Sequence, residues 1–76
     1  MKIDVVTTDK VVYSGDVDIV IAPATDGQLG ILPRHASLLT SIKSGVILVR
    51  NSSGEKEIPV GDGFMEVNDD QVTVLV

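Results

Sequence analysis

The chain has 76 residues, a net charge of -5 and no cysteine. This length suffices for one small domain, and the missing cysteines exclude disulfide bridges and thiolate metal sites. The negative charge would repel phosphate groups, and the two aromatic residues, Tyr13 and Phe64, are too few to stack nucleic-acid bases, so we expect no binding to nucleic acid.

Residues with β-branched side chains dominate the composition. Thirteen valines, seven isoleucines and five threonines outnumber the nine alanines and leucines by a wide margin. Such side chains fit the pleated surface of a sheet better than a helix. The composition therefore predicts an all-β domain. The longest apolar runs, such as residues 46–49, are far shorter than the ~20 residues of a membrane-spanning helix, so we expect none.

Short apolar runs separated by turn residues predict strands along the whole chain. The first should end at the turn-like residues 8–10, and a bend or bulge is expected at Ser14-Gly15. The third should stop at Pro23, and Asp26-Gly27 should form a tight turn in which glycine takes a positive φ. The expected strands cover residues 2–7, 11–13, 16–22, 28–32, 34–43, 46–50, 55–60, 64–67 and 71–76.

The segment 34–43 is ambiguous, because its apolar residues fit either a short helical face or a strand that crosses between layers. We favour the crossing strand. Hairpins are expected at residues 51–54 and 68–70. No interval is long enough for a helical crossover, so many short strands predict a sandwich or a barrel. The last strand runs to Val76 without a turn or a polar tail, from which we expect a further segment in the parent protein.

Few residues could carry chemistry. His35 is the single histidine, and it has no serine in a nucleophile context nearby, so we expect no catalytic triad. One histidine cannot supply a zinc site, and the carboxylates at Asp16 and Asp18 fit the outer side of a strand better than a cation site. Residues 61–63 lack the following lysine of a phosphate loop. The sequence thus predicts no catalytic residue, no metal site and no cofactor.

Residues 26–45 are unusually apolar for a connecting segment, and part of this segment is a candidate docking surface. Its sequence, D-G-Q-L-G-I-L-P-R-H-A-S-L-L-T-S-I-K-S-G, closely resembles the signature G-E-L-G-I-L-P-G-H-A-P-L-L-T-x-L-K-P-G of the epsilon subunit of F-type ATP synthase. Residues 3–7, 13–15, 63–67 and 72–75 resemble other parts of that family in order and spacing. The resemblance covers essentially all of residues 1–76.

The resemblance implies a fold and a function. The fold is a ten-stranded β-sandwich, a flattened barrel of two five-stranded sheets. A carboxy-terminal helical hairpin normally follows it and is absent from residues 1–76, so inhibition and nucleotide binding are not assigned to this chain. The implied function is that of a non-catalytic rotor subunit, which links the gamma subunit to the c-ring of a proton-translocating ATP synthase. The implied location is peripheral, on the cytoplasmic face of the bacterial plasma membrane, with no small-molecule substrate.

The resemblance also assigns contacts by position. Contact with the c-ring is implied for Asp26, Gly27, Gln28 and Leu29, and contact with the gamma subunit for Thr7, His35 and Thr40. The glycine would allow a tight, protruding turn. For His35, a structural hydrogen bond is the alternative to a partner contact, because a flat and polar ring suits both.

Four residues depart from the family signature. Gln28 replaces the usual glutamate, so a contact there would use a hydrogen bond in place of an ion pair. Arg34 replaces a glycine, and Ser37 and Ser44 replace prolines, which would leave the segment less rigid. The alternative to a rotor subunit is a free-standing sandwich that binds a ligand or a protein, for which a concave and partly polar pocket would be needed.

Overall fold

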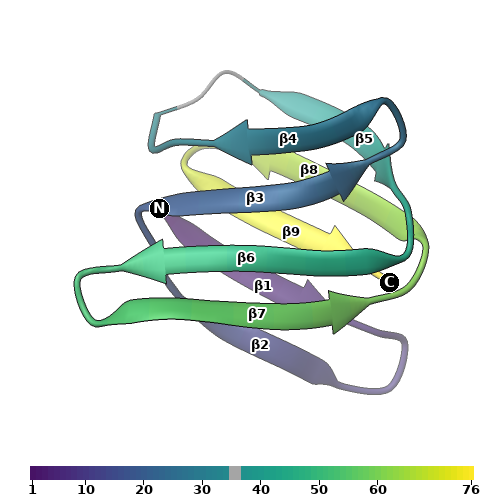
Figure 1. Ribbon diagram of the computed structural model, residues 1–76, viewed down its shortest axis with the longest axis horizontal. Helices are drawn as coiled ribbons and strands as arrows, with labels where there is room; N and C mark the ends of the chain where they lie inside the picture. The colour runs from purple at the N-terminus through teal and green to yellow at the C-terminus, as the bar shows by residue number, and fades with distance from the viewer. Residues whose placement is uncertain (35–36) are drawn as a thin grey trace.

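The computed structural model describes residues 1–34 and 37–76 and contains nine strands (Figure 1). They are β1 (Lys2–Val6), β2 (Val11–Asp16), β3 (Ile19–Ala24), β4 (Gly27–Ile31), β5 (Leu38–Ile42), β6 (Gly45–Asn51), β7 (Gly54–Val60), β8 (Gly63–Asn68) and β9 (Gln71–Leu75). In these residues we find no helix that is long and apolar enough to cross a membrane.

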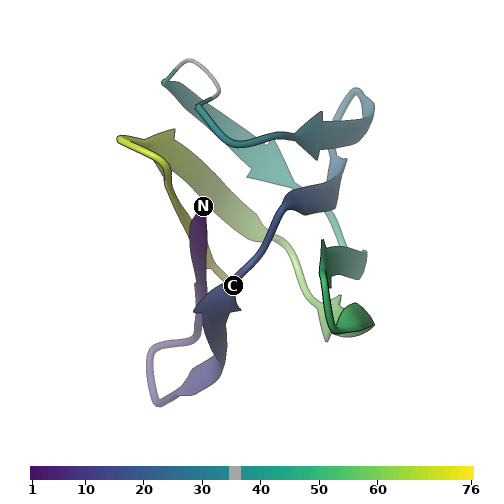
Figure 2. The ribbon, with the colours of Figure 1, turned by 90° about the vertical axis from the view of Figure 1, so that its left-hand side faces the viewer.

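The strands form one hydrogen-bonded path, in the order β2-β1-β9-β8-β5-β3-β6-β7, with β4 paired to β3. This path folds over on itself into two layers (Figures 1 and 2). One layer holds β2, β1, β9, β8 and β5, and the other holds β4, β3, β6 and β7. The predicted all-β sandwich is confirmed, with nine strands in the described residues against the ten that the resemblance implies.

Strand β3 connects the two layers and differs most from the prediction. It begins at Ile19, so Asp16 belongs to β2, and it continues through Pro23 to Ala24. Its first three residues pair with β6, whereas Ala24 pairs with Ile42 of β5. Pro23 lies between these two pairings. Its missing N–H is tolerated because the strand is changing partners at that point.

The predicted bend at Ser14-Gly15 was wrong. Both residues lie inside β2 and pair with β1. The irregularity lies three residues earlier, where the partner of β1 shifts from Tyr13 to Val11 and leaves Val12 as the extra residue of a bulge. In contrast, the choice of a strand over a helical face in residues 34–43 is confirmed for the five residues of β5, Leu38–Ile42. Residues 35 and 36 of that range lie outside the described residues.

The core lies between the two layers and is apolar. Alternate residues of each strand face inward, as the two-residue period of a strand requires. Nearly every strand contributes: the cluster consists of Ile3, Val5, Val17, Val20, Ala22, Ile31, Ile42, Ile47, Val49, Ile58, Met65, Val67, Val72 and Val74. No polar or charged side chain is buried among the described residues. Burial of these aliphatic groups therefore provides the main stabilisation of the fold.

Candidate interaction site

The turn between β3 and β4 lies at one end of the sandwich (Figure 1). Ala24 pairs with Gly27, so Thr25 and Asp26 form the two-residue tip. Gly27 has a φ of 124°, which a residue with a side chain adopts only with strain, and this confirms the positive φ expected there. Asp26, Gly27 and Gln28 are exposed, whereas Leu29 is half-buried and packs against the core. Three of the four predicted c-ring residues are thus accessible, and Leu29 anchors them.

Hydrogen bonds brace this turn against its neighbours. The N–H and the hydroxyl of Thr25 donate to the carbonyl oxygen of Ser41 at 3.3 and 3.2 Å. The N–H of Lys43 donates to the carbonyl oxygen of Pro23 at 2.8 Å. The tip of β3 and β4, in one layer, is therefore fixed to the end of β5, in the other.

The β5–β6 turn is held in the same way. The N–H of Ser44 donates to a carboxylate oxygen of Asp62 at 2.8 Å, and its hydroxyl donates to the same oxygen at 3.3 Å. Asp62 lies in the turn between β7 and β8. Three turns thus form one hydrogen-bonded end of the domain, which we call the braced end: residues 25–26, 43–44 and 61–62.

Thr40 lies in the middle of β5 and pairs with the buried Met65. Paired residues share a face of the sheet, so Thr40 faces the side of the core, where it is half-buried. Its neighbours Leu39 and Ser41 face the opposite, outer side. Thr40 is therefore only partly accessible to a partner.

Thr7 follows β1 and shapes the turn into β2. Its hydroxyl accepts hydrogen bonds from the N–H groups of Asp9 and Lys10, both at 3.2 Å, and its own N–H donates to the carbonyl of Lys10 at 2.9 Å. Thr7 and Thr40 are not in contact, because β9 and β8 separate their strands. Three strand spacings correspond to about 14 Å.

The predicted contact His35 lies outside the described residues. Arg34, just before it, is exposed and has a φ of 64°. The N–H of Arg34 donates to the carboxylate of Asp70 at 2.9 Å, and this hydrogen bond is the main cause that lowers the pKa of Asp70. Asp70 in the β8–β9 turn therefore fixes the position where the chain leaves β4. Sequence reasoning missed this role, because 36 residues separate the two.

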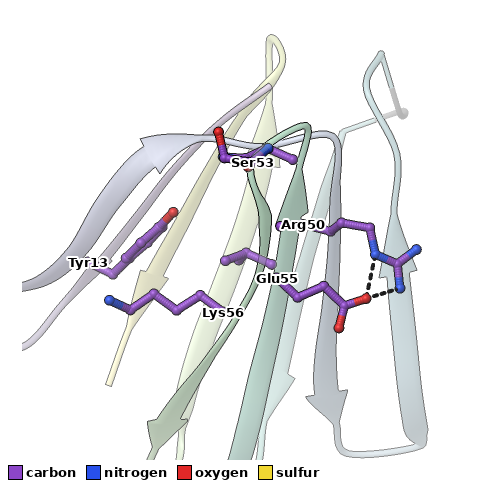
Figure 3. A pocket seen from close by; sticks show the side chains of 8 residues that line it. Tyr13, Arg50, Ser53, Glu55 and Lys56 are labelled. Carbon is purple, nitrogen blue, oxygen red and sulfur yellow. Dashed lines mark hydrogen bonds and ion pairs between the residues drawn. The ribbon is translucent and has the colours of Figure 1, made fainter.

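A small hollow lies where β2 faces the β6–β7 hairpin (Figure 3). Lys56 lies over the ring of Tyr13, with 5.6 Å between its Nζ and the ring centre, a cation–π distance. Arg50 points to the other side of the sheet and binds Glu55, with 2.7 Å between Nε and Oε1. The Lys56 contact joins β7 to β2, whereas the Arg50–Glu55 pair joins β6 to β7, so these charges do not converge on one point of the hollow. The described residues also contain no group of three or more acidic, histidine or cysteine side chains that could hold a metal ion.

A comparison with protein families finds a match over residues 1–76 to the model described as "ATP synthase, Delta/Epsilon chain, beta-sandwich domain". The chain belongs to this family. Among curated relatives, the ATP synthase epsilon chain of Desulforamulus reducens is 45% identical over 74 residues, which are 97% of this chain and 56% of the relative. That of Synechococcus sp. strain CC9605 is 50% identical over 76 residues, which are 100% of this chain and 56% of the relative.

Two solved structures share the fold of this chain. A chain in the mitochondrial ATP synthase of Euglena gracilis superposes with a TM-score of 0.88 at 19% identity, covering 97% of this chain and 48% of the other. One from Tetrahymena thermophila gives a TM-score of 0.80 at 17% identity, covering 99% and 61%. The delta/epsilon sandwich described here thus spans about half the length of the relatives that it matches.

Proposed function

We propose that this chain is the β-sandwich part of a rotor subunit of a proton-translocating F-type ATP synthase, where it links the gamma subunit to the c-ring. The observation that carries this proposal is the family match over residues 1–76. Support comes from the relatives, which are epsilon chains, and from the structures of similar fold, which belong to ATP synthase assemblies with a c-ring.

In this proposal the chain catalyses no reaction and transmits force. The exposed tip at Asp26–Gln28 meets the polar loops of the c-ring, and a face including Thr7, His35 and Thr40 meets gamma. Hydrogen bonds from Thr25 to Ser41 and from Lys43 to Pro23 support this role, because they connect the tip to both layers. A push on the tip would move the domain as one body, which couples rotation of the ring to ATP synthesis. The subunit would lie peripherally on the cytoplasmic face of the bacterial plasma membrane.

The test is capture of the two partners. The chain is co-expressed with the gamma subunit of the same organism, and the purified complex is applied to immobilised c-ring in detergent. We expect copurification with gamma and retention on the ring. Reversing the charge at the tip, Asp26→Lys, should reduce retention on the ring but leave gamma binding intact.

Asp18→Lys is the matched control, because Asp18 is also exposed but lies before β3, at the opposite end from Asp26. Equal loss of ring binding in both variants would mean that net charge, and not the tip, controls retention. A wild-type chain that binds neither partner would contradict the proposed function.

A further inference from the structure

The two strands at the ends of the hydrogen-bonded path face each other without pairing. Among the described residues, β2 pairs only with β1, and β7 pairs only with β6. The small hollow lies between β2 and the β6–β7 hairpin (Figure 3). Backbone hydrogen bonds between strands therefore do not close the sandwich along this side. We call it the seam: the facing edges of β2 and β7.

Side chains bridge the seam at two places. The Nδ2 of Asn51 donates to the carbonyl oxygen of Asp16 at 3.1 Å, next to the connection that joins β2 to β3. Farther along β2, the Nζ of Lys56 lies 5.6 Å from the ring centre of Tyr13. Beyond Tyr13, residues 11 and 12 are 61% and 41% exposed. The contact between Lys56 and Tyr13 thus lies between a connected end and an exposed end of the seam.

The opposite side of the sandwich, which we call the hinge side and which consists of β3 and β5, is closed by the backbone. Strand β3 passes between the layers, because it pairs first with β6 and then with Ile42 of β5. The N–H groups of Thr25 and Lys43 donate to the carbonyl oxygens of Ser41 and Pro23 across the two layers. Separation of the layers at the hinge side would break these backbone hydrogen bonds.

The two sides of the sandwich therefore resist separation unequally. A cation–π contact at an exposed site stabilises a structure only weakly. Backbone hydrogen bonds of paired strands break together with their neighbours, as one cooperative unit. Local opening of a folded domain begins where the contacts are few and exposed to water. This difference predicts that the layers separate at the seam before they separate at the hinge side.

We propose that the domain opens locally at the seam, about the hinge side and without global unfolding, and that the contact between Lys56 and Tyr13 is the latch of this opening. The opening separates β2 from β7 and admits water to Ile58, a core residue of β7 that is 3% exposed in the closed structure. This inference goes beyond the proposed function and does not depend on it, because it concerns the chain without any partner.

The experiment measures how fast a thiol reagent reaches a buried cysteine. The chain has no cysteine, so Ile58→Cys and Ile42→Cys each contain a single thiol. They form a matched pair, because both isoleucines are 3% exposed, one on β7 at the seam and the other on β5 at the hinge side. With reagent in excess, Ile58→Cys should react at least about tenfold faster and with little dependence on urea, because local opening exposes little surface. Urea unfolding of each variant verifies the fold.

Removal of one charge tests the latch. Lys56→Gln, added to Ile58→Cys, should accelerate the reaction about twofold to fivefold, as expected for loss of one exposed cation–π contact. Lys43→Gln is the matched control, because Lys43 is also exposed but lies at the braced end. Tyr13 is the single tyrosine and the chain has no tryptophan, so fluorescence provides a second readout without a new cysteine. Acrylamide should quench this fluorescence more strongly in Lys56→Gln than in Lys43→Gln.

The possible results differ clearly. Faster reaction at the seam, accelerated further by Lys56→Gln alone, supports the inference. Equal rates with equal urea dependence for the two cysteines overturn it, because both sides would then open only on global unfolding. A faster reaction of Ile42→Cys overturns it as well, since the opening would lie on the other side. If Lys56→Gln changes neither the reaction rate nor the quenching, the contact is not a latch and that part of the inference is wrong. The proposed function is tested separately, by binding to gamma and to the c-ring.

Discussion

Replacing Gly63 by alanine should destabilise the domain strongly, because β8 approaches the end of β9 too closely for a side chain. A Cβ at this position would overlap with the carbonyl oxygen of Leu75 and would lie 2.9 Å from its carbonyl carbon and 3.0 Å from the Cα of Val76. These atoms belong to the backbone, so they cannot rotate away, and the two strands would have to separate. Overpacking of this kind costs about 1–3 kcal/mol. For a domain of this size, this corresponds to a decrease in Tm of roughly 4–24 °C.

Gly61 is the matched control, two residues earlier. A Cβ on Gly61 would meet nothing within 4 Å, and the residue does not have a positive φ. Gly61→Ala should therefore be neutral or slightly stabilising, by up to about 1 kcal/mol, because alanine restricts the unfolded chain. Both variants are compared by thermal and urea unfolding. If Gly63→Ala and Gly61→Ala have the same Tm, the close approach of the Leu75 carbonyl does not exist in solution.

Three further predictions concern the turns and one carboxylate. Gly27→Ala should lower the free energy of unfolding by about 1 kcal/mol or more, measured in urea, because alanine is strained at a φ of 124°. Asp62→Ala should lower the free energy of unfolding by about 1 kcal/mol in the same assay, because the N–H of Ser44 loses its acceptor. Ser44→Gly should not cause an equal decrease, because its backbone N–H can still donate to Asp62. The hydroxyl of Ser14 lowers the pKa of Asp4, so the folded state favours the charged form. This stabilisation is present above the pKa of the unfolded chain and is lost as the pH falls through the lower folded value; the Tm of Asp4→Asn should therefore depend less on pH below about pH 4.

The alternation of apolar and polar residues predicted most of the fold because each layer has one buried side. The alternation in β8 and β9 leaves Met65, Val67, Val72 and Val74 inside, as the period of two requires. The Asp26-Gly27 turn was equally predictable, because a tight turn depends on the residues within the turn itself. The path of β3 through Pro23 was not predictable in this way. The strand tolerates Pro23 because it changes its partner from β6 to β5 at that point, and the sequence around Pro23 contains no information about which strands pair with it.

The candidate site was only partly predictable for the same reason. The resemblance assigned candidate contacts to Asp26 to Leu29 and to Thr40 by position, but it did not indicate that Leu29 packs inward and that Thr40 faces the side of the core. The outward position of Phe64 could have been predicted, because it alternates with the buried Met65 and Val67 along β8. Whether an outward apolar residue is covered by another strand or exposed depends on the layer arrangement, which the pattern of one strand does not contain.

The braced end explains why the β3–β4 turn at the end of a small domain can be stiff. A two-residue tip on an isolated hairpin would bend about its own strands, because a two-stranded ribbon is marginally stable by itself. Here Thr25 is bonded to Ser41, which is 16 residues away in the chain, and Lys43 is bonded to Pro23. The tip therefore cannot move without β5, and β5 is paired with β8 along its whole length. In the proposed rotor subunit, a force applied at Asp26 would pass through these bonds into the layer of β2, β1, β9, β8 and β5, so that the turn and this layer are connected mainly by backbone hydrogen bonds instead of flexible side chains.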